Sequence, residues 1–273
     1  IGMNIVFTCG GTGGHINPAI AVANIWKERY PDSKILFIGS QGRMEEELVP
    51  KAGYDIYTIP ASGMSREKNL AGLKHNIRAV SYVLQSVGRC KKVLRDFGAD
   101  VVVGTGGFAS FPALLAGSQL KVPTVVHEAN AVPGLTTRML ADKVDIVMVA
   151  FEESIKRYKN PKHIETVGMP VRREFIYTEK EAARQELGLD NRPVIVSTFG
   201  SQGARAMNLV TAEVLKLEQE EGFPYQHIHG VGSFGWEWFP DKLEQLGVDQ
   251  NNSSLDIREY IYNMPTVMAA ADV

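Results

Sequence analysis

Three glycine-rich turns, each lying between an apolar run and a helical pattern, are the parts of this sequence best suited to chemistry. They contain, in chain order, Gly10, Gly11, Gly13 and Gly14; Gly104, Gly106 and Gly107; and Gly200 and Gly203. Glycine lets a backbone turn sharply and come close to a ligand, and the helix that follows offers free N–H groups to an anion. The pattern predicts phosphate-binding turns, with a tight turn that binds nothing as the alternative.

Two common phosphate motifs are absent from the sequence. The Rossmann fingerprint G-x-G-x-x-G fails because a match starting at Gly11 places Ile16 where the last glycine belongs. The next apolar run, "KILFIGS", ends in Gly39 and Ser40 without the acid that would bind a ribose hydroxyl. No glycine is followed by the Lys-Ser or Lys-Thr pair of a P-loop. NAD and ATP are therefore disfavoured as ligands.

Two titratable residues are candidates for a general base. His15 directly follows the first turn, and a neutral imidazole suits proton transfer near pH 7. Its alternative roles are to bind a phosphate or to cap the helix. Glu128, in "VVHEAN", ends an apolar run and is the second candidate. Because the sequence contains no Asp-x-Asp, we expect no metal, and we expect no cofactor.

The order of elements indicates the fold class. Apolar runs such as "KILFIG", "DVVVGTG" and "PVIVSTFG" alternate with helical patterns. This order predicts an α/β protein with parallel sheets covered by helices. We expect a first domain at 1–168 and a second at 169–273, which face each other across a cleft. The second domain would hold about three strands, few for a doubly wound unit, so we expect the natural protein to continue past Val273.

Composition and charge restrict the partners. The net charge of −2 gives no indication of nucleic-acid binding. Cys9 and Cys90 lack metal or redox spacing, which is typical of a reducing cytosol. No apolar run approaches the length of a membrane span. The segment 65–95 is basic and partly apolar, so we predict that Lys74, Arg78 and Arg89 bind an anionic membrane surface.

Five motifs in one order carry a family resemblance. "CGGTGGHINP", "GTGGFASFPA", "HEAN", "GMPVR" and "GSQGAR" resemble the MurG family, the N-acetylglucosaminyltransferases of peptidoglycan synthesis. The resemblance implies the GT-B fold, two Rossmann-like domains around a cleft, with the second incomplete in this chain. It implies inverting transfer of N-acetylglucosamine from UDP-N-acetylglucosamine to lipid I, which gives lipid II. The chain departs from the family at Ala129, Met169 and Phe199.

The resemblance also assigns residues to substrates. Those implied for UDP-N-acetylglucosamine are Thr12, Gly13, Gly14, Asn130, Arg172, Ser201 and Ile261, the last through its backbone. Those implied for the acceptor diphosphate are Gly11, Gly13, Gly14, Gly104, Gly106 and Gly107. The third turn, at Ser201, would hold the donor diphosphate. The implied location is the cytoplasmic face of the bacterial cell membrane, as a peripheral protein, with cell-wall synthesis proteins as further partners.

Two other functions remain open from the sequence. A UDP-N-acetylglucosamine 2-epimerase would share the fold and the donor. A non-catalytic module that recruits a split glycosyltransferase to the membrane is the other alternative. Because the family's remaining donor residues follow the strand that begins at Asp272, we expect this chain alone to bind the donor poorly and to be essentially inactive.

Overall fold

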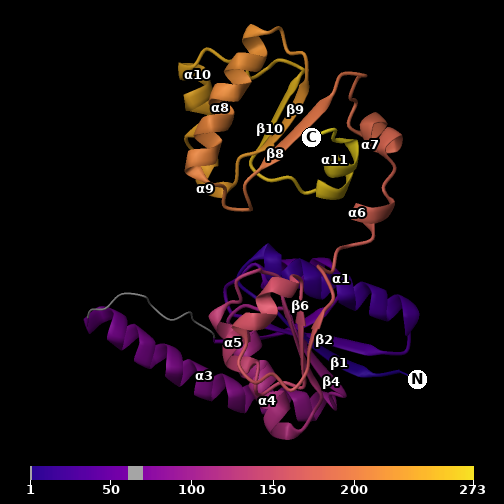
Figure 1. Ribbon diagram of the computed structural model, residues 1–273, viewed down its shortest axis with the longest axis vertical. Coiled ribbons are helices and arrows are strands. Elements are labelled where there is room, and N and C mark those ends of the chain that lie inside the picture. Colours follow the sequence, from indigo (N-terminus) through magenta and orange to yellow (C-terminus); the bar gives the residue numbers. More distant parts are fainter. Residues whose placement is uncertain (1, 61–69) are drawn as a thin grey trace. The chain divides into compact units, whose positions relative to one another are not determined.

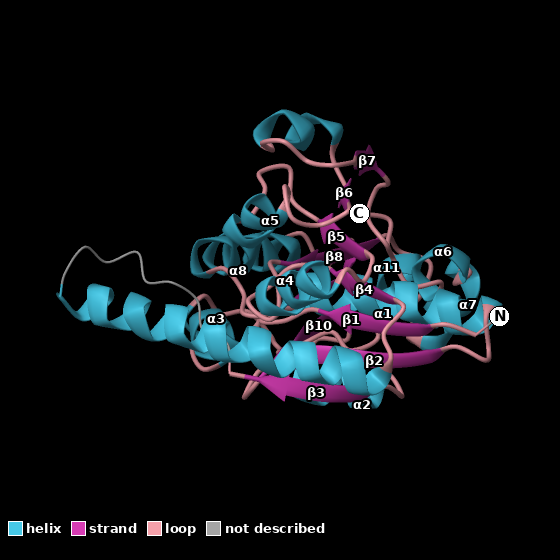
Figure 2. Ribbon diagram, turned by 90° about the horizontal axis from the view of Figure 1, so that it is seen from below, coloured by secondary structure: helices cyan, strands magenta, loops and turns pink. Residues whose placement is uncertain are grey.

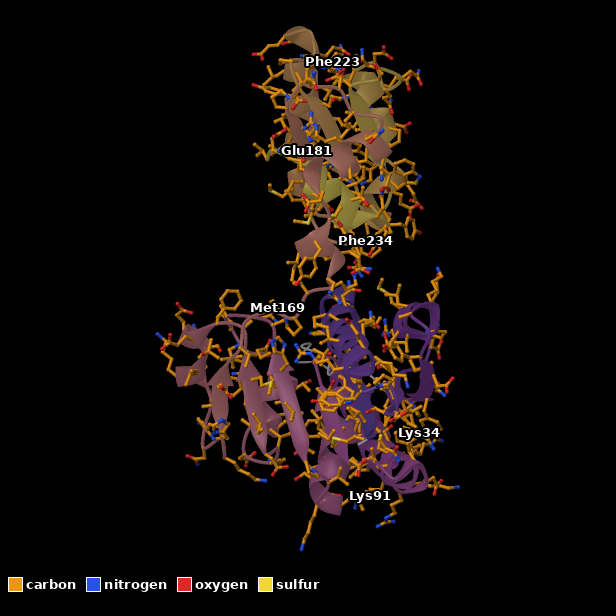
Figure 3. The ribbon with its side chains drawn as sticks, turned by 90° about the vertical axis from the view of Figure 1, so that its right-hand side faces the viewer. Lys34, Lys91, Met169, Glu181, Phe223 and Phe234 are labelled. Carbon is orange, nitrogen blue, oxygen red and sulfur yellow. The ribbon has the colours of Figure 1, made fainter. Side chains whose placement is uncertain are left out.

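The protein is described by a computed structural model that covers residues 2–60 and 70–273, with the backbone alone for residues 70–81. The chain divides into two compact units, Ile1–Arg172 and Arg173–Val273. Figure 1 shows the first unit in indigo to pink and the second in orange to yellow. Met169, labelled in Figure 3, lies shortly before the chain leaves the first unit.

The first unit contains a seven-stranded parallel sheet. Its strands are β1 (Asn4–Thr8), β2 (Lys34–Ser40), β3 (Asp55–Ile59), β4 (Val101–Gly104), β5 (Thr124–Glu128), β6 (Ile146–Val149) and β7 (Ile164–Thr166). They lie in the order β3-β2-β1-β4-β5-β6-β7, and Val6 of β1 pairs with Leu36 on one side and Val102 on the other. The strand order therefore reverses between β1 and β4. In such sheets, ligands bind outside the carboxyl ends of the strands at this switch point.

Helices cover both faces of this sheet. They are α1 (Gly13–Arg29), α2 (Glu45–Lys51), α3 (Leu70–Phe97), α4 (Ser110–Leu120), α5 (Leu135–Leu140) and the 3-10 helix η1 (Glu152–Arg157). One buried cluster joins Phe7 and Phe37 of the sheet to Ile16 of α1. Another joins Val6 to Leu94 of α3 and Leu114 of α4. Figure 2 shows β1 to β4 side by side with α3 along them. Successive apolar side chains of the strands therefore pack into two cores, one on each face of the sheet.

The second unit contains a three-stranded parallel sheet in the order β10-β9-β8. Its elements are α6 (Glu174–Tyr177), α7 (Lys180–Glu186), β8 (Val194–Thr198), α8 (Arg205–Glu220), β9 (Gln226–Gly230), α9 (Ser233–Trp236), α10 (Phe239–Gln245), β10 (Leu255–Arg258) and α11 (Met264–Ala270). Leu215 of α8 and Phe239 of α10 share one buried cluster, while Ile228 of β9 and Val267 of α11 share another. Two parallel sheets with helices on both faces confirm the predicted α/β class.

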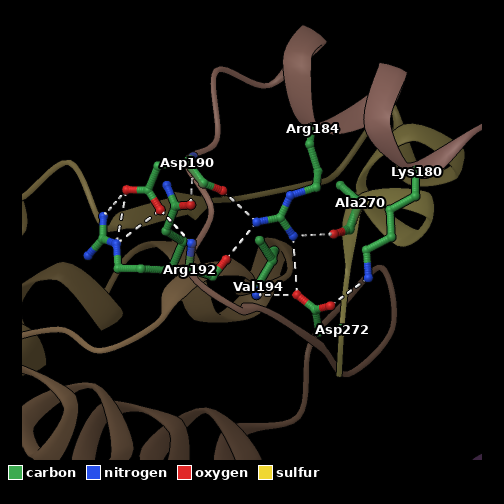
Figure 4. Close-up of polar contacts among 8 residues, drawn as sticks. Lys180, Arg184, Asp190, Arg192, Val194, Ala270 and Asp272 are labelled. Carbon is green, nitrogen blue, oxygen red and sulfur yellow. Dashed lines mark hydrogen bonds and ion pairs between the residues drawn. The ribbon is translucent and has the colours of Figure 1, made fainter.

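A carboxylate fastens the end of the second unit to its sheet (Figure 4). Asp272 accepts hydrogen bonds from the backbone N–H of Val194 at 2.8 Å, from Arg184 at 3.2 Å and from Lys180. Arg184 also donates to the carbonyls of Ala270, Asp190 and Arg192. The hydrogen bond from Lys180 is the largest influence that lowers the pKa of Asp272 to about 2. The ionised form of Asp272 is therefore favoured by the fold.

We predict a pH-dependent loss of stability when Asp272 is replaced by Asn. The folded-state pKa of Asp272 lies below the usual value of 3.8, so its contribution to stability is present above about pH 4 and disappears as the pH falls toward 2. Urea unfolding followed by circular dichroism should show Asp272→Asn less stable than the wild type near neutral pH, with the gap closing near about pH 2.5. Asp241→Asn, an exposed site on α10, is the control. A gap that is equal at both pH values would contradict this assignment.

Candidate active site

A cavity of about 580 Å³ opens at the carboxyl ends of β1, β4 and β5. Its lining comes from the first two glycine turns, the segment after β5 and the start of α5. The lining residues are Gly10, Gly11, Thr12, His15, Arg43, Gly106, Gly107, Phe108, Glu128, Asn130, Gly134, Leu135, Thr136 and Thr137. The cavity therefore lies at the switch point of the sheet and is lined by residues that follow all three strands.

The two turns touch through their backbones. A Cβ atom at Gly107 would lie 2.1 Å from the carbonyl oxygen of Gly10, and Gly107 has a φ of +87°. A Cβ atom at Gly106 would lie 2.7 Å from Cδ2 of His15. At Gly107 the clash is with backbone, so only glycine fits, whereas at Gly106 a side chain would displace the His15 ring. These glycines let the second turn pack on the first and leave room for the His15 ring.

Hydroxyl groups fasten this contact. Thr105 donates to the backbone carbonyl of His15 at 2.6 Å. Buried Ser110, the first residue of α4, donates to the carbonyls of Gly106 at 2.7 Å and Thr8 at 3.0 Å. The beginnings of α1 and α4 are thereby held at the same edge of the sheet. The N-terminal N–H groups of both helices, which lack intrahelical partners, lie at this edge.

The orientation of His15 fixes which of its ring nitrogens carries hydrogen. Nδ1 lies 3.1 Å from the carbonyl oxygen of Gly10 and 3.4 Å from Oγ1 of Thr12. A carbonyl can only accept a hydrogen bond, so Nδ1 must be the donor. The neutral ring then has an unprotonated Nε2 with a free lone pair. His15 lines the cavity, and an unprotonated Nε2 is able to take up a proton.

Glu128 is a buried carboxylate with every oxygen occupied. Oε1 accepts from the backbone N–H of Asn130 at 3.0 Å and from its side-chain amide at 2.8 Å. Oε2 accepts from the N–H of Gly134 at 2.8 Å and from the hydroxyl of Thr137. Burial alone would raise the pKa of Glu128, but these four hydrogen bonds outweigh it and lower the pKa below its usual value. The ionised carboxylate of Glu128 therefore holds residues 128–137 in their conformation.

His127 supports the same strand from the other side. Its Nε2 lies 2.9 Å from the carbonyl oxygen of Gly168, which has a φ of +76°. Burial lowers the pKa of His127, so this ring is neutral near pH 7. It ties β5 to the segment that precedes Arg172.

The third glycine turn follows the first strand of the second unit. A Cβ atom at Gly203 would lie 2.1 Å from the carbonyl oxygen of Val231, so this turn also packs on a neighbouring backbone. The carbonyl of Ser201 accepts from the N–H of Ser233 at 3.2 Å. Ile261 has a buried side chain in the core with Val267. Ser201 and Ile261 thus lie after β8 and β10, at the carboxyl ends of the smaller sheet.

A buried polar chain lies beside this turn. The carboxylate of Glu218 is 3.0 Å from Nδ1 of His227, whose Nε2 is 2.8 Å from the hydroxyl of Ser197. That hydroxyl lies 2.7 Å from Nδ1 of His229. Burial, reinforced by the neighbouring His227, lowers the pKa of His229 to about 4. The chain links α8 to β8 and β9 just before the third turn.

The cavity brings together only part of the predicted site. Among the predicted residues, it is lined by Gly11, Thr12, His15, Gly106, Gly107, Glu128 and Asn130. Gly13 and Gly14 form the first turn of α1 without lining it. Gly104 is the last residue of β4 and faces the core, because a Cβ atom there would lie 2.5 Å from Cδ1 of Leu114. Arg172 is at the end of the first unit, and Ser201 and Ile261 are in the second.

Two charged residues near the cavity were not predicted from the sequence. Arg43 lines the cavity and brings a positive charge to it. Glu45, the first residue of α2, is completely buried beside the first turn. In "GRMEEEL" both look like ordinary surface charges around a helix N-terminus. No local pattern marks Glu45, because the space that Gly10 and Gly39 leave for its side chain arises only where β1 and β2 lie side by side.

Comparisons with known proteins agree on a family. Residues 5–149 match the glycosyltransferase family 28 N-terminal domain. A relative from Caldanaerobacter subterraneus subsp. tengcongensis is 38% identical over 99% of this chain and 72% of its own length. Another, from Acetivibrio thermocellus, is 34% identical over 99% of this chain and 71% of its own. Both are named UDP-N-acetylglucosamine–N-acetylmuramyl-(pentapeptide) pyrophosphoryl-undecaprenol N-acetylglucosamine transferase.

Solved structures agree with the fold. Acinetobacter baumannii MurG matches with a TM-score of 0.65 and 23% identity, covering 99% of this chain and 72% of that one. The UDP-GlcNAc 2-epimerase from Neisseria meningitidis, bound to UDP-GlcNAc, matches with a TM-score of 0.60 and 15% identity over 98% and 75%. At these identities the likeness extends to the fold alone, and it confirms the predicted GT-B architecture.

We predict that alanine at two glycines of the turns changes the free energy of unfolding by very different amounts. Gly107→Ala should lower the free energy of unfolding by about 2 kcal/mol or more, because it combines a positive φ with a backbone clash. Gly14→Ala should change it by less than about 1 kcal/mol, because its methyl group would lie 3.7 Å from Oγ1 of Thr12. Urea unfolding measures both. Equal stabilities of the two variants would mean that the turns do not touch as described.

Proposed function

The chain belongs to the MurG family of N-acetylglucosaminyltransferases, and we propose that the cavity at its first two glycine turns is the acceptor site. The enzyme transfers N-acetylglucosamine from UDP-N-acetylglucosamine to lipid I, giving lipid II in peptidoglycan synthesis. In this reaction a muramyl hydroxyl attacks the anomeric carbon, the bond to UDP breaks and the hydroxyl proton passes to a base. A single direct displacement inverts the anomeric centre.

The observation that carries this proposal is the contact of 3.1 Å between Nδ1 of His15 and the carbonyl oxygen of Gly10, from which the tautomer follows. The Nδ1–H is held by this carbonyl, and Nε2 is left as an acceptor on a ring that lines the cavity. A general base must offer such a lone pair within hydrogen-bond reach of the proton it removes. We therefore assign the base to His15, whose protonation during attack leaves an imidazolium stabilised by the same carbonyl.

Glu128 suits a positioning role better than the role of base. All of its hydrogen bonds are accepted from protein donors, and these bonds lower its pKa. A carboxylate with a lowered pKa is a weak proton acceptor for an alcohol. Its bonds to Asn130 and Gly134 instead hold the cavity wall in place. Asn130, which the resemblance assigns to the donor sugar, is oriented by one of them.

The acceptor diphosphate would be held by helix N-termini and one cation. The proposed hydrogen-bond donors are the N–H groups of Gly106 and Gly107, which line the cavity, and those of Gly13 and Gly14, which lie between the lining residues Thr12 and His15. Arg43 lines the same cavity and would add a charge-assisted contact. We assign Gly104 to shaping the turn, because its backbone is covered by Leu114. The N–H of Gly11 is already donated to the carboxylate of Glu45, so Gly11 is not a donor to the diphosphate in this proposal.

The donor would be bound largely by the second unit. The third glycine turn precedes α8, a helix of 16 residues, and offers its N-terminus to the UDP diphosphate near Ser201. The backbone of Ile261 and the side chain of Arg172 are the further contacts that we propose for the nucleotide. Thr12, Gly13 and Gly14 remain candidates for the donor as well as the acceptor. Family membership supports these assignments.

The membrane surface is the proposed location, on the cytoplasmic face, with peripheral attachment through α3. No helix among the described residues is long and apolar enough to cross a bilayer. Cys90 and Leu94 of α3 are buried against the first unit, whereas Leu84 and Arg89 of the same helix are exposed. Lys91 of the same helix is labelled in Figure 3. The side chains of Lys74 and Arg78 lie outside the described residues, so their part in the patch stays a prediction.

We predict that His15→Ala in the enzyme lowers kcat by roughly 100-fold or more, the usual size of a general-base contribution. Initial rates of N-acetylglucosamine transfer to a short-chain lipid I analogue measure it. The KM for UDP-N-acetylglucosamine should change little. An unchanged kcat with a raised acceptor KM would instead assign His15 to phosphate binding and contradict the base.

We predict salt-sensitive binding to vesicles that contain phosphatidylglycerol. Each basic residue near an anionic surface contributes about 1 kcal/mol, so replacing Lys74, Arg78 and Arg89 with Glu should abolish sedimentation with the vesicles at low salt. Replacing the exposed Lys156, Arg157 and Lys159 with Glu makes the same charge change elsewhere and is the control. Equal binding by both triple variants would place the membrane contact on another surface.

A further inference from the structure

Glu45 is a buried carboxylate that the reaction does not use directly. It is the first residue of α2, has no exposed surface, and reaches between the ends of β1 and β2. Its Oε1 accepts from the backbone N–H of Ser40 at 2.8 Å, and its Oε2 accepts from the N–H of Gly11 at 3.0 Å. Burying a carboxylate is costly unless it is hydrogen-bonded, so this pair of contacts is what keeps it there.

Two glycines make room for this side chain. A Cβ atom at Gly10 would lie 2.4 Å from Oε1 of Glu45, and one at Gly39 would lie 2.6 Å from its Cγ. Gly10 lies two residues after the end of β1, and Gly39 is the last residue but one of β2. The glycines at these two strand ends are therefore needed for Glu45, independently of any phosphate.

The contact of Glu45 with Gly11 acts on the peptide group that holds His15. The peptide group between Gly10 and Gly11 donates its N–H to Glu45 and accepts from Nδ1 of His15 through its C=O. In a trans peptide these two groups point in opposite directions. One peptide plane is thus held between a carboxylate and an imidazole.

We propose that Glu45 is a positioning residue for His15 that acts through the peptide group between Gly10 and Gly11. This proposal rests on the assignment of His15 as the base. The carboxylate fixes the peptide plane so that its carbonyl faces Nδ1 of His15, which keeps hydrogen on Nδ1 and leaves Nε2 free. Hydrogen bonds in such a chain polarise one another, so the carboxylate also strengthens the carbonyl that stabilises the protonated ring.

The glycines on both sides of this peptide explain why a clamp is needed. Gly11 has a φ of +88°, and glycine adopts positive and negative φ about equally well. Glycine on both sides therefore removes the side-chain barrier that would otherwise oppose a flip of this peptide plane. A flipped peptide would point its N–H at Nδ1 of His15 and favour hydrogen on Nε2, the tautomer that cannot accept the proton. The negative charge of Glu45 opposes the flip because it would face a carbonyl oxygen.

The test compares Glu45→Gln with Glu46→Gln in the same chain. Glu46 is exposed on the same helix and gives the same charge change without touching the turn. The tautomer of His15 is read from long-range proton–nitrogen NMR spectra of its imidazole, which need no activity. We expect hydrogen on Nδ1 in the wild type and in Glu46→Gln, and a mixture with the Nε2–H form in Glu45→Gln. In the enzyme, kcat should fall roughly tenfold or more in Glu45→Gln but not in Glu46→Gln. Mutations of residues that orient metal-binding histidines have effects of this size.

The outcomes separate this proposal from that of the base. An unchanged tautomer and an unchanged kcat in Glu45→Gln would overturn the role of Glu45. A wild-type kcat in His15→Ala would overturn the base, while the tautomer would still report whether the clamp exists. If Glu45→Gln does not fold, the wild-type spectrum decides, because an Nε2–H tautomer of His15 in the wild type would overturn the proposal.

Discussion

The contact between two backbone turns at the ends of β1 and β4 is the constraint on which this site depends. The carbonyl of Gly10 is packed so closely against Gly107 that no side chain fits between them. The same carbonyl accepts the hydrogen bond of His15, and the adjacent N–H is held by Glu45. The proposed phosphate-binding geometry, the tautomer of His15 as the proposed base, and the position of the first residues of α1 and α4 at one edge of the sheet therefore depend on one small region of backbone.

This arrangement gives the glycines of the first unit different tasks, although they look alike in the sequence. Gly10 and Gly39 leave space for a buried carboxylate, and Gly106 leaves space for an imidazole ring. Gly104 makes room for Leu114 of the core, whereas Gly14 lies at a helix N-terminus where an added Cβ atom would make only an ordinary contact with Thr12. Local pattern reveals that the chain turns sharply at such residues. The local pattern does not reveal whether a core residue, a polar side chain or a ligand lies opposite each glycine.

The fold and the glycine turns could be predicted because their signals are local. Alternation of apolar runs with helical patterns indicates parallel sheets, and clustered motifs indicated the family. Arg43 and Glu45 could not be predicted, because their importance comes from β2 lying beside β1 in the sheet. The four hydrogen bonds of Glu128 likewise come from a loop conformation that its spacing does not encode. The roles assigned to the ranges 1–168 and 169–273 stay predictions, while the chain itself divides after Arg172.

The most direct measurement for the acceptor site is a crystal structure of this chain with a short-chain lipid I analogue. We expect the diphosphate at the N-termini of α1 and α4, close to Arg43. We expect the attacking muramyl hydroxyl about 3 Å from Nε2 of His15, the distance that proton transfer requires. A diphosphate bound outside this cavity, or a hydroxyl directed at Glu128 instead of His15, would contradict it.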